Sequence, residues 1–203
     1  MFFFSYETLI DPVLKSVRLA APGFADMQAG QTVLDVCCGT GSQVIIYAEK
    51  GLTATGIDLE EKMLSVGRKN RDNLRLKNAS FLQADAAALP FEDGIFDWVS
   101  ISFALHDKDD ATRGKIVKEM KRVVKPQGAF IFIDFTTPLP GNIWALAARA
   151  VEFAVGGAHY EGFKTYRQKG GLEGLLKRHS ISIVKTSRHI GKIATLIKAT
   201  CQP

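Results

Sequence analysis

Cysteine is scarce in this chain, with three residues among 203. Two of them, Cys37 and Cys38, are adjacent, so the three cannot form a spaced disulfide framework, and no spacing of cysteine and histidine resembles a zinc site. Free cysteines are typical of a reducing compartment, which indicates a cytoplasmic protein. From the sequence alone we therefore predict no disulfide scaffold and no metal site.

Long hydrophobic runs are also missing, and no window reaches the length of a membrane span. The opening segment, MFFFSYETLI, has a short aromatic cluster, but it lacks the basic start and the cleavage signature of a signal peptide. We expect Phe2, Phe3 and Phe4 to pack against the domain or to form part of a lid. Peripheral association with a membrane stays open as the alternative.

Basic charge is not concentrated in any one segment. The chain has 26 Lys and Arg residues against 21 Asp and Glu, a formal net charge of +5, but these residues recur singly along it. A nucleic-acid-binding protein would show a concentrated basic face interleaved with aromatic side chains. We therefore expect a solvated surface, a small-molecule partner and no nucleic acid. The composition does not indicate an oligomeric state.

Apolar strand-like runs alternate with helical stretches along most of the chain, which is the pattern of a doubly wound α/β protein. The expected strands are residues 32–36, 53–57, 79–83, 96–102, 129–135, 181–186 and 190–199. The last two are expected to form a hairpin that turns at residues 187–189. We predict a single domain over residues 1–203 with a Rossmann-like, doubly wound, seven-stranded sheet, mostly parallel with a C-terminal antiparallel hairpin strand.

Two segments lie outside this alternation, and we expect both to cover a ligand. Residues 1–30 are predicted to form an N-terminal helical lid. Residues 136–179 are predicted to form a substrate-cap insertion between the fifth and sixth strands. Within the insertion we expect an apolar helix over residues 144–155, followed by an irregular, glycine-rich connection over residues 156–171.

The stretch VLDVCCGTG, residues 33–41, joins the first strand to the helix that follows it. Gly39 and Gly41 let the backbone approach a ligand closely, and the free amides of the next helix point to the same place. A dinucleotide-binding loop needs a third glycine, which is missing here, and Asp35 would repel a pyrophosphate but favour a cationic ligand. The bend therefore indicates a cofactor other than a dinucleotide.

Two further acids follow the second and third strands. Asp58 can accept hydrogen bonds from both hydroxyls of a ribose, or it can cap the next helix. Asp85 can accept from an adenine amino group while the amide of Ala86 donates to the ring, although taken alone this is an ordinary turn. The carboxyl ends of parallel strands meet at one edge of a sheet, so these residues and Asp35 together predict one adenosine bound across three strand ends.

These segments resemble the motifs of class I S-adenosylmethionine-dependent methyltransferases. VLDVCCGTG resembles the glycine-rich motif, GIDLEEKML the ribose-binding motif and QADAAALPFEDGIFDWV the adenine motif. FDWVSISFALHD and RVVKPQGAFIFIDFTTP are similar to segments of the ubiquinone/menaquinone biosynthesis C-methyltransferases, although Gln127, Asp134 and Thr136 replace that family's Gly, Glu and Ser. The resemblance implies S-adenosylmethionine as cofactor and in-line methyl transfer to a small, hydrophobic or aromatic, quinone-like acceptor.

The resemblance also implies roles for individual residues. The implied cofactor-binding positions lie at the ends of the first four strands: Asp35, Gly39, Thr40, Gly41, Asp58, Leu59, Asp85, Ala86 and Ser102. Within this set, Gly39, Thr40 and Gly41 would hold the methionyl end of the cofactor, which Ser102 would also contact. Leu59 would flank the adenine.

His106 is the candidate catalytic residue. It comes just after the fourth strand, whose end faces the methyl group in this architecture, and it would act as a general base if the acceptor loses a proton as it attacks. The alternative is a structural histidine held by hydrogen bonds. Two other functions also stay open, a catalytically silent S-adenosylmethionine-binding protein and an NAD-dependent oxidoreductase.

Overall fold

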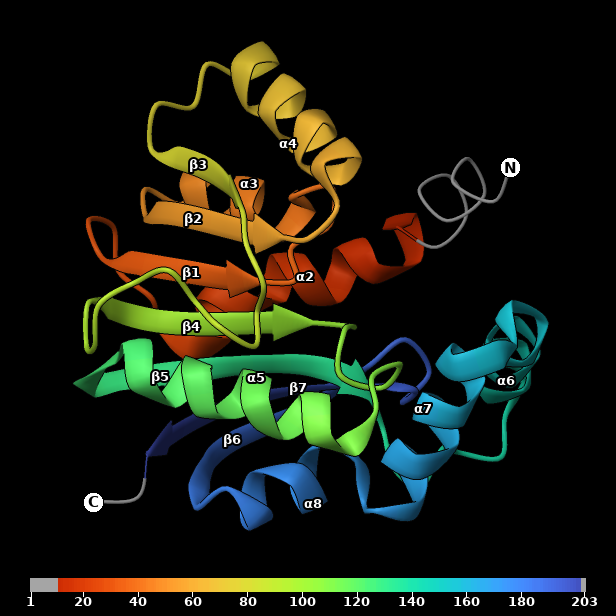
Figure 1. Ribbon diagram of the computed structural model, residues 1–203. Coiled ribbons are helices and arrows are strands. Elements are labelled where there is room, and N and C mark those ends of the chain that lie inside the picture. The colour runs from red at the N-terminus through yellow and green to blue at the C-terminus, as the bar shows by residue number, and fades with distance from the viewer. Residues whose placement is uncertain (1–10, 202–203) are drawn as a thin grey trace.

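The computed structural model describes residues 11–201 (Figure 1), so the predicted contacts of Phe2, Phe3 and Phe4 lie outside the described residues. The strands are β1 Thr32–Val36, β2 Thr53–Asp58, β3 Ala79–Gln83, β4 Phe96–Ser102, β5 Val124–Phe135, β6 Ile181–His189 and β7 Ala194–Cys201. The helices are α2 Asp11–Ala25, α3 Ser42–Glu49, α4 Glu61–Asn73, α5 Asp110–Val123, α6 Ile143–Val155, α7 Gly157–Gln168 and α8 Gly171–Arg178. Each predicted strand is present, and β5 begins earlier than expected, at Val124.

The seven strands form one sheet in the order β3-β2-β1-β4-β5-β7-β6. Strands β1 to β5 pair in parallel, whereas β7 runs antiparallel to both β5 and β6. The predicted fold class, a mostly parallel doubly wound sheet with a C-terminal antiparallel hairpin, is therefore confirmed. The strand order reverses between β1 and β4, and open α/β sheets bind their ligands at the carboxyl ends of the strands beside such a reversal.

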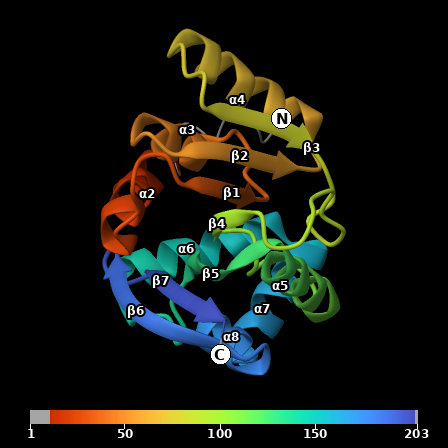
Figure 2. The ribbon, with the colours of Figure 1, turned by 90° about the vertical axis from the view of Figure 1, so that its left-hand side faces the viewer.

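Helices cover both faces of the sheet (Figure 2), and each face has its own apolar core. On one face Met120 of α5 and Leu176 of α8 belong to the core cluster. On the other face Val17 of α2 and Tyr47 of α3 occupy the corresponding positions. Because both faces are covered, the central strands are apolar on both sides, as in the fully buried run Phe130–Ile133.

The irregular connection predicted for residues 156–171 is wrong, because α7 occupies most of it. The prediction followed the glycines, but Phe163 and Tyr166 are spaced three residues apart on one helical face and are both buried. Gly162 permits this packing, since a Cβ atom there would lie 2.3 Å from the carbonyl oxygen of Asp107. The glycine therefore marks the close approach of a helix to a loop.

The final hairpin also turns later than predicted. Strand β6 continues through residues 187–189, where the sequence places the turn, and the turn occupies residues 190–193 instead. Ile190 and Lys192 both have positive φ, at 51° and 69°. Non-glycine residues with positive φ are uncommon, so the sequence of this turn does not reveal it.

Helices α6 and α7 lie beyond the carboxyl ends of the parallel strands, to the right of the sheet in Figure 1. They belong to the segment predicted to form a substrate cap, and α2 belongs to the predicted N-terminal lid. Within residues 11–201, no helix is both long enough and apolar enough to cross a lipid bilayer.

Candidate functional site

A cavity of about 250 Å³ lies at the carboxyl ends of β1, β2 and β4. Its lining residues are Arg18, Asp35, Cys37, Cys38, Gly39, Thr40, Ser42, Gln43, Asp58, Met63, Ser102, Phe103, Ala104, Asp107 and Lys108. The structure thus brings together five of the residues predicted to bind a cofactor, namely Asp35, Gly39, Thr40, Asp58 and Ser102.

The two glycines of the bend after β1 serve different purposes. Gly41 has a φ of 77°, and a Cβ atom there would lie 2.3 Å from the ring of Phe81, so this glycine allows the bend to pack against β3. Gly39 has a φ of 54°, and a Cβ atom there would meet no atom of the described residues within 4 Å. The space beside Gly39 is therefore clear at the cavity wall, which suits a ligand that approaches the backbone closely.

Asp35 is a buried carboxyl group at the cavity. It is 2% exposed, and its Oδ1 accepts a hydrogen bond of 2.5 Å from the hydroxyl of Ser100. Burial raises the pKa of Asp35 to about 7, although the hydrogen bond from Ser100 and the positive charge of Arg18 act in the opposite direction. A cation bound next to this group would favour its ionised form, so Asp35 fits the amine of a ligand.

Asp58 connects the end of β2 to the glycine bend. Its Oδ2 accepts a 2.8 Å hydrogen bond from the amide of Gly39, and its Oδ1 accepts a 3.0 Å bond from the amide of Glu60, the N-cap of α4. The sequence predicts that Asp58 binds a ribose or caps a helix. The structure adds a third role, the hydrogen bond from the amide of Gly39. Each carboxylate oxygen has a second lone pair, so Asp58 can fix the bend and accept a ligand hydroxyl in one geometry.

Two buried polar atoms at the cavity have no hydrogen-bond partner within the described part of the chain, the Oγ of Ser102 and the Oε1 of Gln43. Buried polar atoms are nearly always paired, so unpaired ones in a cavity wall point to a ligand. Arg18 and Lys108 add positive charge to the lining, and Lys108 also pairs with Asp107 at 2.8 Å. The lining therefore offers charges of both signs, as a zwitterionic ligand requires.

Four predicted cofactor-binding residues do not line this cavity: Gly41, Leu59, Asp85 and Ala86. Leu59 follows β2 and is 61% exposed, whereas Ala86 is buried. The Oδ1 of Asp85 accepts a 2.8 Å hydrogen bond from the amide of Ala87, which closes its own turn. The adenine subsite therefore stays a prediction.

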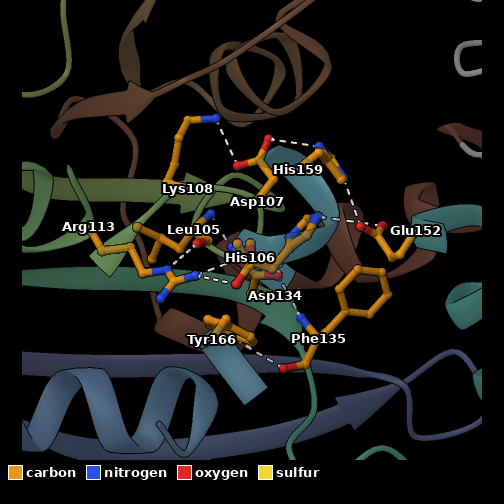
Figure 3. Close-up of polar contacts among 11 residues, drawn as sticks. Leu105, His106, Asp107, Lys108, Arg113, Asp134, Phe135, Glu152, His159 and Tyr166 are labelled. Atoms are coloured by element: carbon orange, nitrogen blue, oxygen red, sulfur yellow. Dashed lines mark hydrogen bonds and ion pairs between the residues drawn. The ribbon is translucent and has the colours of Figure 1, made fainter. Parts of the chain in front are cut away.

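His106 belongs to the loop after β4 but lies in a buried polar cluster (Figure 3), and unlike its loop neighbours Asp107 and Lys108 it does not line the cavity. Its Nδ1 is 2.7 Å from Oδ1 of Asp134, and its Nε2 is 3.7 Å from Oε1 of Glu152. Burial lowers the pKa of His106, but the carboxylates of Asp134, Glu152 and Asp107 outweigh it and raise the pKa above its ordinary value. An acceptor would have to reach Nε2 past Glu152, so the role of general base stays a prediction.

Sequence reasoning missed Arg113, which fixes the loop after β4. Its side chain is fully buried, donates hydrogen bonds to the carbonyl oxygens of Leu105 and Gly162, and lies 5.5 Å from the ring centre of Tyr166. The arginine therefore joins the loop to α7. A basic residue on a charged, amphipathic helix reads as a surface residue, so no pattern in the sequence reveals this role.

The two adjacent cysteines line the cavity as thiols. Burial raises the pKa of Cys37 to about 12 and raises that of Cys38 as well. The thiolate is the reactive form of cysteine, so both side chains stay protonated and unreactive near neutral pH. Cys37 and Cys38 are therefore best described as small side chains that fill space in the bend.

The chain is similar to proteins of one known family. The model of the ubiE/COQ5 methyltransferase family matches residues 21–147. Demethylmenaquinone methyltransferases of Bacillus cereus strain B4264 and Bacillus anthracis strain A0248 are 43% and 42% identical to this chain over 128 residues. The match covers 61% of this chain and 53% of each relative, so the chain spans about half the length of the curated relatives it matches.

Solved structures share the fold over most of the chain. An S-adenosylmethionine-dependent methyltransferase from Aquifex aeolicus has a TM-score of 0.65 at 21% identity, covering 96% of this chain and 92% of its own. Magnesium protoporphyrin IX methyltransferase from Synechocystis PCC 6803 has a TM-score of 0.68 at 19% identity, covering 94% and 83%. Since the family model spans more than half of the sequence, including the glycine bend and all five parallel strands from β1 to β5, the chain belongs to the ubiE/COQ5 methyltransferase family, as its resemblance to the quinone-biosynthesis enzymes predicts.

Proposed function

We propose that this chain transfers a methyl group from S-adenosylmethionine to a small, hydrophobic acceptor. The observation that carries the proposal is the cavity in which Gly39 leaves clear space, Asp58 fixes the glycine bend and Asp35 supplies a buried carboxyl group. The family of the chain supports the same cofactor.

The lining residues fit the chemical groups of this cofactor. Asp35 would balance its amine, and Arg18 or Lys108 its carboxylate, because each pair brings opposite charges together at a partly buried site. Asp58 would accept from the ribose hydroxyls, as carboxylates at this strand end do in nucleotide-binding sheets. The unpaired Oγ of Ser102 would gain a partner at the methionyl end.

The bound cofactor supplies a methyl group on a sulfonium, which is reactive without further activation. The residues of this chain then have to orient that group and keep water away from it. Such positioning lowers the barrier by about 7 kcal/mol in favourable cases. The loop after β4, residues 103–108, borders both the cavity and α7, so we place the acceptor on that side of the cofactor.

We further propose a quinone-like ring as the acceptor, methylated at carbon, with an oxygen or nitrogen of another small metabolite as the alternative. The relatives named demethylmenaquinone methyltransferases support the ring. The apolar surface of α6 supports a hydrophobic substrate, since Ile143, Leu146 and Phe153 are each more than 60% exposed there. Large apolar side chains grouped on one surface mark sites that contact apolar ligands or partners.

The test is turnover with a short-chain demethylmenaquinone analogue and S-adenosylmethionine, with the methylated product followed by mass spectrometry. We expect methylated product from the wild type and a loss of at least about tenfold in kcat/KM for Asp58→Ala, the change that one lost hydrogen-bonding group gives. Glu49→Gln, at an exposed acid of α3 outside the cavity lining, is the matched control and should keep the wild-type rate. Cofactor binding without transfer to any ring acceptor would favour the silent-binding alternative.

A further inference from the structure

His106, Glu152 and His159 converge on one point although they come from three separate segments, the loop after β4, helix α6 and helix α7 (Figure 3). One donor atom from each of the three side chains lies within 4.8 Å of the other two. The Oε2 of Glu152 is 2.7 Å from Nε2 of His159, and its Oε1 is 3.7 Å from Nε2 of His106. His106 and Glu152 are 4% and 5% exposed, so the cluster is largely shielded from solvent.

The far nitrogen of each imidazole faces a second carboxylate. The Nδ1 of His106 lies 2.7 Å from Asp134, whose two oxygens also accept from the amides of Leu105, His106 and Phe135. The Nδ1 of His159 lies 3.5 Å from Oδ2 of Asp107. A carboxylate that holds the proton on Nδ1 leaves the lone pair of Nε2 for the centre of the cluster. In His159 a metal would replace the 2.7 Å hydrogen bond between Nε2 and Glu152. Metal-binding histidines have this arrangement of outer partners.

Without positive charge at its centre, the cluster would bring the electron-rich Nε2 atoms of two imidazoles against the carboxylate of Glu152. With its Nδ1 proton donated to Asp134, His106 can pair with Glu152 only when Nε2 also carries a proton or when a metal ion lies between the two groups. Neither Lys108 nor Arg113 forms an ion pair with Glu152 in the described part of the chain: Lys108 pairs with Asp107 at 2.8 Å, and Arg113 donates to backbone carbonyls. Buried carboxylates are stable only when they are paired or coordinate a metal, so the centre calls for positive charge, carried either by the imidazoles or by a metal ion that they and Glu152 bind together.

We propose that Nε2 of His106, Nε2 of His159 and the carboxylate of Glu152 bind a divalent transition metal of the zinc type, with Asp134 and Asp107 as the outer groups that orient the two imidazoles. Bonds of about 2.0–2.1 Å to zinc in a tetrahedral site place neighbouring ligand atoms about 3.3 Å apart, between the two separations to Glu152 found here. Imidazole with carboxylate suits zinc and its neighbours, whereas Mg²⁺ and Ca²⁺ prefer oxygen ligands alone.

Three protein ligands leave the fourth position of a tetrahedral site open. Aromatic rings line the surroundings: the rings of Phe135 and Phe163 have their centres 4.8 Å and 6.2 Å from that of His106. The site is also close to the cavity, because Asp107 lines the cavity while its carboxylate faces His159. Metal binding nevertheless does not depend on the proposed methyl transfer, since none of the three ligands lines the cavity.

The test is zinc binding by purified chain without a histidine tag, stripped with a chelator and then titrated in competition with a chromophoric chelator. We expect one zinc ion per chain and little response to Mg²⁺. Glu152→Gln and His159→Gln should each weaken binding by at least about tenfold, and Asp134→Asn by about 10–100-fold, the usual cost of losing an outer partner. His179→Gln is the matched control, because this half-buried histidine packs near Gly114 on α5 and belongs to no such cluster among residues 11–201.

Two results would overturn the site: no zinc binding by the wild type, or wild-type affinity in Glu152→Gln. A second measurement needs no ligand variant and therefore does not depend on how well such variants fold. X-ray absorption at the zinc edge of the wild-type protein should show nitrogen and oxygen neighbours only, and sulfur neighbours would assign the metal to Cys37 and Cys38 instead. Titration of the same samples with S-adenosylmethionine reports separately on the proposed function, so the failure of one does not imply the failure of the other.

Discussion

Asp35 is the residue whose environment has the clearest measurable consequences. Its carboxyl group is buried beside Ser100, and burial raises its pKa to about 7. A group with that pKa changes its charge within the ordinary working range of pH. Both ligand affinity and protein stability should therefore depend on pH in ways that a single substitution can test.

We expect the affinity for S-adenosylmethionine to rise as the pH increases from about 5 to 7 and then to level off. Below pH 7 the free protein holds Asp35 in its protonated form, and the proton must leave before the carboxylate can balance the amine of the cofactor. Calorimetric titration in buffers of different ionisation enthalpy measures both the affinity and the released proton. A flat profile in this range would contradict the placement of the amine beside Asp35.

Asp35→Asn should stabilise the free protein at pH 8 while weakening cofactor binding. In the wild type the folded-state pKa is about 7 and the unfolded value is about 3.9, so stability falls between these two pH values and is constant above them. Three pKa units correspond to at most about 4 kcal/mol, and asparagine removes this loss while it still accepts from Ser100. Thermal melts at pH 4.5 and pH 8 should show a much larger gain at pH 8, because pH 4.5 lies only just above the unfolded pKa. Equal melting temperatures for both proteins at pH 8 would count against the raised pKa.

At the scale of elements, the docking of α7 onto the loop after β4 joins the cap segment to the sheet. Gly162 of α7 touches the backbone of Asp107, and Arg113 of α5 donates to carbonyl oxygens on both segments. This junction also brings His159 to His106. The close approach of the two backbones and the burial of Phe163 and Tyr166 together fix the position of α7.

Gly162→Ala should destabilise the protein by about 1–3 kcal/mol, the usual cost of overpacking, because its Cβ would lie 2.3 Å from the carbonyl oxygen of Asp107. Gly23→Ala in α2 is the matched control, since a Cβ there meets no atom within 4 Å and alanine raises helix propensity by about 1 kcal/mol. Urea denaturation should therefore show opposite signs for the two variants. A gain in stability for Gly162→Ala would contradict the close packing of α7.

The elements differ in how well the sequence reveals them, and the reason is local. Strands β1 and β4 have the bounds that the sequence predicts, because each is a short, mainly apolar segment between turn residues. Helix α7 is missed because its glycines, judged from the local sequence alone, predict an interruption of the helix. Gly162 is instead required by the contact of α7 with the loop that contains Asp107. The turn at Ile190 is missed because isoleucine rarely adopts a positive φ, so its presence in the sequence does not suggest a turn.

At the scale of the whole molecule, the parallel topology explains which site residues are predictable. Asp35, Asp58 and Ser102 each lie at or near a strand end, so the order of strands alone brings them to one edge of the sheet. The cluster of His106, Glu152 and His159 depends instead on how α6 and α7 pack. His106 precedes Glu152 and His159 by more than forty residues, so no short ligand spacing reveals the full set.

The central claim is that the clear space beside Gly39 is where S-adenosylmethionine approaches the backbone, and calorimetric titration of Gly39→Ala tests it most directly. Gly30→Ala is the matched control, because Gly30 also has positive φ and open space around a Cβ atom but does not line the cavity. Both variants should lose similar stability, about 1–2 kcal/mol from the strained backbone.

We predict that Gly39→Ala binds S-adenosylmethionine at least about tenfold more weakly than the wild type, whereas Gly30→Ala binds it normally and no variant binds NAD. The wild type should show one cofactor site per chain. Wild-type affinity in Gly39→Ala, or binding of NAD in place of S-adenosylmethionine, would contradict the account of this cavity.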